Sequence, residues 1–168
     1  MAEKTIEENM KEILSGDLLK NALNFIEYLK SNDVPPDSPD SDSFSYLGEN
    51  VCVIGIFDEV FGKIIESPAF VIFFCNDDIC EHVNSQVDKY LIEFAQSNVN
   101  YCAYFTTGGK QCGCENKPGK RTTIFGKEFN NVCHCPLWFY NPDAKILENI
   151  KNLVEIWKNN IAELKSSK

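Results

Sequence analysis

The sequence lacks any hydrophobic run long enough to cross a bilayer. Its first ten residues, MAEKTIEENM, are polar and acidic where a secretory signal peptide has an apolar core. We therefore expect a cytoplasmic protein without a membrane partner. In that reducing compartment, cysteines are more often free thiols, metal ligands or redox groups than parts of a structural disulfide framework. The eight cysteines of this chain are accordingly its first candidates for function.

Basic residues are scarce as well. Lys and Arg total 16 against 25 Asp and Glu, Arg121 is the single arginine, and the net charge is -9. Because nucleic-acid binding draws most of its affinity from basic side chains, this balance argues against a nucleic-acid partner. A length of 168 residues with 43% hydrophobic residues is ample for one packed core, so we expect a single domain over residues 1–168.

Two familiar motifs are missing. The chain has neither a Cys-x2-Cys pair of the thioredoxin type nor a Gly-x4-Gly-Lys-Ser/Thr phosphate loop. A Cys/His nucleophilic centre would need His82 or His134 beside a thiol. We expect His134 on the opposite strand face from its neighbours, and Cys80 and His82 to diverge at a helix start, so nucleophilic catalysis is disfavoured. No acid/base pair stands out, and whether the protein is an enzyme stays open.

Hydrophobic spacing predicts three helical regions and a set of short strands. The helical regions lie at 6–29 with a break at Ser15-Gly16-Asp17, at 78–97, and from Asn141-Pro142-Asp143 to Leu164. The strands lie at 44–47, 51–57, 69–74, 99–105, 121–125 and 132–140, with turns expected at Gly48-Glu49-Asn50 and Gly126-Lys127-Glu128. Pro68 is expected at a strand start, where its missing hydrogen-bond donor is tolerated.

Two segments read as loops. Residues 33–43 are acidic and rich in proline, which indicates an exposed connection, and residues 106–120 are rich in Cys, Gly and Lys without periodicity. The second loop needs something to order it, such as a bound metal. The order of elements predicts an α+β domain, with an antiparallel sheet of five or six strands packed by N-terminal, central and C-terminal helices.

Five of the eight cysteines lie between Cys102 and Cys135, and four of them form two Cys-x-Cys pairs. In a strand, Cys133 and Cys135 would point to one face and His134 to the other. Cys112 and Cys114, separated by a glycine, can fold over that pair and complete a tetrahedral zinc site of four thiolates. Cys102 is a fifth candidate ligand. The alternative for Cys102 and Cys135 is a role as small buried hydrophobic residues.

Basic residues are concentrated around the same segment. They are Lys110, Lys117, Lys120, Arg121 and Lys127, against one internal acid, Glu115. Such a positive field favours thiolates and can hold an anion, for which Lys120 and Arg121 are the candidates. The alternative is a solvated loop whose lysines serve solubility.

Three functions remain in view. The first is a metal-binding protein or sensor, with zinc held by Cys102, Cys112, Cys114, Cys133 and Cys135. The second is a thiol–disulfide enzyme or switch that uses the same cysteines, because a Cys-x-Cys disulfide is easily reduced. The third is a regulatory module that binds a small molecule in an aromatic pocket. Cys52 and Cys75 lie in apolar strands, and we expect them in the core.

The stretch from Cys114 to Cys133, Cys-x3-Pro-Gly-Lys-Arg-x2-Ile-Phe-Gly-Lys-Glu-Phe-x-Asn-Val-Cys, is followed by Tyr140-Asn141-Pro142-Asp143-Ala144. It resembles a group of small uncharacterised bacterial proteins with a similar N-terminal helix, a sheet and a Cys/Gly-rich segment before this signature. The resemblance implies no activity. It points first to Cys102, Cys114 and Cys133, together with Cys112. Because Cys135 fits the pattern less well, it leaves room for a site of three sulfurs with an exchangeable ligand.

Overall fold

The computed structural model of the chain describes residues 4–60, 63–75, 87–102 and 119–167. Its described elements are α1 (Ile6–Ile13), α2 (Gly16–Ser31), β1 (Ser43–Tyr46), β2 (Glu49–Val60), β3 (Lys63–Phe74), α4 (Lys89–Ser97), β4 (Val99–Tyr101), β5 (Lys120–Ile124), β6 (Lys127–Tyr140) and α6 (Ala144–Ser166). They form the α+β fold that the sequence predicts, and the break predicted in the N-terminal helix separates α1 from α2.

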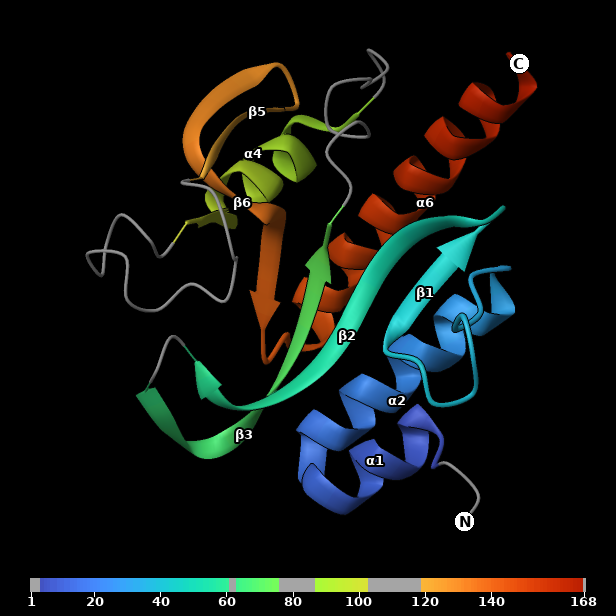
Figure 1. Cartoon of the computed structure of the whole chain (residues 1–168), viewed down its shortest axis with the longest axis vertical. Helices are drawn as coiled ribbons and strands as arrows, with labels where there is room; N and C mark the ends of the chain where they lie inside the picture. Colours follow the sequence, from blue (N-terminus) through green and yellow to red (C-terminus); the bar gives the residue numbers. More distant parts are fainter. Residues whose placement is uncertain (1–3, 61–62, 76–86, 103–118, 168) are drawn as a thin grey trace.

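The sheet has the strand order β1-β2-β3-β6-β4, and β5 pairs with β6 off this path. Every described pairing is antiparallel. Figure 1 shows α6 crossing one face of the sheet, with α1 and α2 beside the β1–β2 hairpin. None of the described helices has both the length and the apolar composition needed to cross a membrane.

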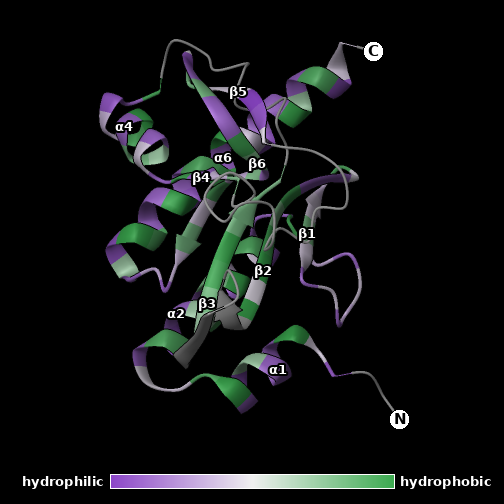
Figure 2. Cartoon of the chain, turned by 60° about the vertical axis from the view of Figure 1, so that its left-hand side comes forward, coloured by the Kyte–Doolittle hydropathy of each residue, from purple (hydrophilic) through white to green (hydrophobic). Residues whose placement is uncertain are grey.

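The core lies between the sheet and the helices. The indole of Trp157 in α6 is fully buried and packs on Phe74 of β3, with ring centroids 5.0 Å apart. Phe25 and Leu29 of α2 are also fully buried. Colouring by hydropathy shows the same division, because β2 and β3 are largely apolar whereas the helices alternate between polar and apolar sides (Figure 2). Burial of these apolar faces stabilises the packing of helix on sheet.

Two tight turns connect strands that are adjacent in sequence. Leu47 and Gly48 link β1 to β2, and Phe125 and Gly126 link β5 to β6, with positive φ at all four residues. Two consecutive residues of positive φ are typical of the turn whose twist matches a hairpin. Both turns lie one or two residues earlier than the sequence pattern predicts, and Glu49 and Lys127 already belong to strands.

The strand predicted at 69–74 is longer than expected. It begins at Lys63, so Pro68 lies inside β3 and the prediction that it starts the strand is wrong. The pairing of β2 with β3 changes register between Phe57 and Glu59, opposite this proline. Because proline cannot donate a backbone hydrogen bond, an irregular point in the ladder accommodates it inside a strand.

The helix predicted at 78–97 is not continuous. α4 begins at Lys89, and the side chain of Asp88 accepts a hydrogen bond from the Tyr90 N–H at 2.7 Å as its N-cap. An N-cap residue has non-helical backbone angles and ends the helix on its N-terminal side. Residues 78–86 of the prediction lie outside the described residues.

Candidate thiol site

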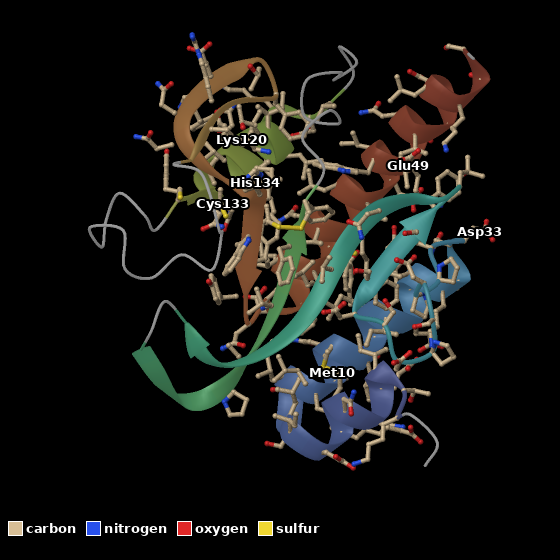
Figure 3. All side chains as sticks on the ribbon, viewed as in Figure 1. Met10, Asp33, Glu49, Lys120, Cys133 and His134 are labelled. Atoms are coloured by element: carbon tan, nitrogen blue, oxygen red, sulfur yellow. A yellow bond between two sulfur atoms is a disulfide. The ribbon has the colours of Figure 1, made fainter. Side chains whose placement is uncertain are left out.

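A disulfide joins Cys75, at the end of β3, to Cys135 of β6, 60 residues further along the chain. The two strands pair next to it through Phe74 and Leu137. Figure 3 shows the bond in the middle of the sheet, near the labelled Cys133 and Lys120. The prediction that Cys75 is a plain core residue is therefore wrong: it follows the last residue of its strand and is only half-buried.

The strand β6 is irregular where it carries Cys133 and Cys135. Its partner β4 pairs Tyr101 with Val132 and Val99 with Leu137, so a longer stretch of β6 faces a shorter stretch of β4. Such an extra length is a bulge, which redirects side chains and interrupts alternation. His134 is exposed within the bulge, and the two cysteines on either side of it are half-buried. The simple alternation predicted for this segment therefore does not fix where the sulfurs point.

Cys133 carries a free thiol beside the first residue of β5. Burial lowers the pKa of Lys120, and the attraction of the Cys133 thiolate opposes that lowering. Burial, with a smaller contribution from the charge of Cys133, raises the pKa of Tyr140 to about 12. Lys120 and Tyr140 are thus two described side chains whose pKa values respond to the charge of Cys133.

The start of β5 packs tightly against the end of β4. A Cβ atom added to Gly119 would lie 2.6 Å from Cys102 Cβ and equally close to the Asn131 backbone. The N–H of Cys102 donates to the Asn131 carbonyl at 2.7 Å. Cys102 and Gly119 therefore meet at this point of the sheet. Cys102 is 3% exposed and carries a free thiol there.

The two residues predicted to bind an anion have different surroundings. Lys120 is half-buried near Cys133, whereas Arg121 is exposed and forms an ion pair with Glu128 across the β5–β6 hairpin. The hydrogen bond and charge of Glu128 raise the pKa of Arg121. Because Glu128 compensates the guanidinium charge, Arg121 is a weaker candidate for an anion than its charge alone indicates.

The predicted metal ligands are distributed as follows. Cys102, Cys133 and Cys135 lie in or beside β4 and β6, and Cys135 is occupied by its disulfide. Cys112 and Cys114 lie outside the described residues. Within the described part of the chain, no three Cys, His, Asp or Glu side chains gather as a metal-binding group. Cys52, by contrast, is a free thiol buried in the core, as predicted, and burial raises its pKa.

The aromatic strand residues considered for a small-molecule pocket do not form one face: Phe44, Phe70 and Phe74 are fully buried in the core, whereas Trp138 is half-buried. The rings of Phe73 and Trp138 stack with centroids 5.3 Å apart. The ring centroids of Trp138 and Tyr140 are 5.6 Å apart. A groove of about 700 Å³ lies elsewhere, between α4 and α6. Its lining includes Tyr90 and several asparagines of α6 in place of an aromatic cluster. An aromatic ligand pocket stays a prediction.

The residue that sequence reasoning missed at this site is Cys75. Its apolar strand suggested the core, but Asn76, Asp77 and Asp78 follow it directly and mark a strand end. A cysteine at a strand end is available to a neighbouring strand, which was the usable signal.

Comparison with known proteins found no matching protein family, no matching curated protein and no matching solved structure.

Proposed function

We propose that this protein is a thiol–disulfide redox protein in which the Cys75–Cys135 bond forms and breaks reversibly. The observation that carries the proposal is the position of that bond beside a free thiol, Cys133, and the ammonium group of Lys120. A redox thiol needs a partner sulfur within bonding reach and solvent access, and all three cysteines are half-buried instead of enclosed.

The surrounding sheet supports reversibility. Residues Val71 to Phe74 of β3 pair with Leu137 to Tyr140 of β6 next to the disulfide, so the two strands stay together without it. A crosslink between residues 60 apart restricts the unfolded chain. The chain-entropy relation for a loop of this size gives about 4 kcal/mol of stabilisation in the oxidised state. Redox state would therefore change stability without requiring a different fold.

The test is a redox titration of the purified protein in glutathione buffers, read by peptide mapping and by the thermal midpoint. We expect reversible interconversion of the reduced protein and protein that contains the Cys75–Cys135 disulfide, with a higher thermal midpoint for the disulfide form. Cys75→Ser removes the crosslink between residues 60 apart and, with it, the large redox dependence of the thermal midpoint. Cys52→Ala is the matched control, because it removes a buried thiol that has no sulfur partner. A bond that never forms, or that yields only after denaturation, contradicts the proposal.

A second candidate function is zinc binding by Cys102, Cys112, Cys114 and Cys133, with Cys135 as a ligand in the reduced protein. One observation favours it. Cys102 and Gly119, which precede and follow the sequence that carries Cys112 and Cys114, are in contact with each other. Gly119 also contacts Asn131, two residues before Cys133, so this contact lies near two free thiols that are soft metal donors, Cys102 and Cys133.

Elemental analysis of protein purified under reducing conditions tests this second candidate. About one zinc per chain, released by oxidation and lost in Cys133→Ser, is the expected result. Metal-free reduced protein that takes up no added zinc contradicts it and leaves the redox proposal standing.

A further inference from the structure

We propose that Cys133 is the thiol that exchanges with the Cys75–Cys135 disulfide and moves it to a Cys133–Cys135 bond. This inference rests on the proposed redox function and deepens it, since it names the residue through which external thiols act. The structure therefore assigns three cysteines to one exchange centre: Cys75 as the internal partner, Cys135 as the shared sulfur and Cys133 as the attacking thiol.

The first support is chain geometry. Cys133 and Cys135 are separated by one residue, and chain dimensions keep their Cα atoms within roughly 7 Å in any conformation. They lie in the bulge between Val132 and Leu137, where the pairing of β6 with β4 loses its register. In a regular strand, side chains two residues apart are held parallel. The bulge relaxes that constraint and lets the two sulfurs approach each other.

The second support is the advantage of Cys133 over other thiols as the attacking group. Thiols held on one short segment react at effective concentrations far above those of a dissolved thiol. We therefore expect Cys133, two residues from a disulfide sulfur, to attack that sulfur more often than a dissolved thiol does. Cys102 is also free, but it is almost fully buried and lies at the Gly119 contact. Cys52 is buried in the core.

The exchange balances without an external oxidant. The Cys133 thiolate donates an electron pair to Cys135 Sγ, the Cys133–Cys135 bond forms, and the Cys135–Cys75 bond breaks. Cys75 leaves as a thiolate with the electron pair of the broken bond. An external thiolate, such as glutathione, then attacks Cys133 Sγ and releases the Cys135 thiolate. A second external thiol resolves the mixed disulfide, so that the protein gains two thiols and the external pair becomes a disulfide.

The side chains around Cys133 suit this role. Lys120 places a positive charge near the sulfur, where it attracts anionic thiolates approaching from solvent. His134, next to Cys133, is exposed and marks the solvent side of the bulge. In the side-chain view, the labelled Lys120, Cys133 and His134 lie together where the start of β5 meets the middle of β6, with the disulfide beside them (Figure 3).

The experiment maps disulfides by trypsin digestion after rapid alkylation. Cleavage after Lys127 and Lys145 places Cys133 and Cys135 in one peptide, while Cys75 lies in another, between Lys63 and Lys89. A Cys133–Cys135 bond therefore appears as a bond within one peptide, and Cys75–Cys135 as a link between two. We expect both isomers in partly oxidised wild type, the internal bond alone in Cys75→Ser, and the link alone in Cys133→Ser.

Reduction kinetics supply the second readout. With glutathione as the probe, Cys133→Ser is expected to lose its disulfide about tenfold more slowly than wild type, because the intramolecular route is gone. Cys102→Ala is the matched control and should keep the wild-type rate. Reduction of Cys133→Ser at the wild-type rate, or absence of the internal bond in Cys75→Ser, overturns the exchange role of Cys133. If the Cys75–Cys135 link never cycles in any variant, the redox function itself fails.

Discussion

Gly119 lies so close to Cys102 that a Cβ atom on the glycine would stand 2.6 Å from Cys102 Cβ. The same atom would overlap the carbonyl carbon and oxygen of Asn131, which are backbone atoms of the central strand β6. This contact brings the end of β4 and the start of β5 together beside the candidate thiol site. Only a residue without a side chain fits between these neighbours.

Gly119→Ala is therefore expected to destabilise the protein by about 1–3 kcal/mol, the usual cost of overpacking, because backbone cannot move aside cheaply. Denaturant unfolding measures the loss of unfolding free energy. Faster alkylation of Cys102 would show that the destabilised region includes the Gly119–Cys102 contact. Gly126→Asn is the control: nothing lies near Gly126, and asparagine tolerates its positive φ. Equal stability of Gly119→Ala and wild type would mean that the contact is looser than described.

Asn141 joins β3 to the start of α6. Its side-chain Oδ1 accepts from the Phe70 N–H at 2.8 Å, and its own N–H donates to the Phe70 carbonyl at 2.7 Å. Its φ is 43°, which asparagine tolerates better than alanine does. Asn141→Ala should cost about 1–3 kcal/mol, because it leaves the Phe70 donor unpaired and strains the backbone.

Asn141→Asp tests that explanation, since the carboxylate keeps an acceptor oxygen and a similar backbone tolerance. Chemical denaturation should place it much closer to wild type than the alanine variant. Similar losses for both variants would show that the hydrogen bond to Phe70 is not the cause.

Tyr28 of α2 donates its hydroxyl hydrogen to Glu155 of α6 at 2.7 Å, and Lys151 lies over its ring. Burial first, and then the hydrogen bond and charge of Glu155, raise the pKa of Tyr28. The folded protein therefore holds this proton more tightly than the unfolded chain. This contribution to stability is complete below about pH 10 and is lost as pH rises above it.

Tyr28→Phe should lower stability at neutral pH by about 1–2 kcal/mol and flatten the decline above about pH 10. Urea unfolding at a series of pH values measures both effects. Tyr46→Phe is a suitable control, because Lys158 lies over that ring in the same way. An unchanged alkaline slope in Tyr28→Phe would assign the decline to other groups.

Lys120 interacts electrostatically with Cys133, whereas its neighbour Arg121 is paired with Glu128. Lys120→Gln should slow the reaction of Cys133 with the anionic thiol glutathione by about threefold at low salt, and change its reaction with neutral 2-mercaptoethanol less. Stopped-flow reduction of the oxidised protein separates the two probes. Arg121→Gln should leave both rates close to wild type. An equal effect on both thiols would mean that Lys120 does not act by attracting anions.

The local elements were largely predictable. The helix predicted from Asn141-Pro142-Asp143 to Leu164 corresponds to α6, whose N-cap Asp143 accepts from the Ile146 N–H at 2.7 Å. Both hairpins of adjacent strands were predicted near their true turns. Helices, strands and turns depend mainly on residues that are close in sequence. The period of the apolar residues also indicates which side of each helix or strand is buried. One error lies at Pro68, where β3 extends further toward the N-terminus than the apolar pattern predicts. The other lies at Asp88, whose capping side chain begins α4 later than the helical pattern predicts.

The candidate site was predicted only in part. Clustering along the chain drew attention to Cys102, Cys133 and Cys135, and two of the three are still free thiols in the described structure. A cysteine sulfur can bind a metal, form a disulfide or remain a free thiol, and the outcome depends on sulfur–sulfur distances of a few ångströms. The spacing of cysteines in the sequence does not determine these distances. Lys120 and Arg121 are adjacent in the chain, yet their surroundings differ, because Arg121 forms an ion pair with Glu128.

By itself, the sequence determined the α+β class, the hairpins and the helices, because backbone preferences and burial of apolar faces act over a few residues at a time. The tertiary structure alone decided that Cys75 meets Cys135 and that Gly119 meets Cys102. Those contacts follow from how β3 and β4 register against β6, and register is set by the packing of the whole sheet against its helices.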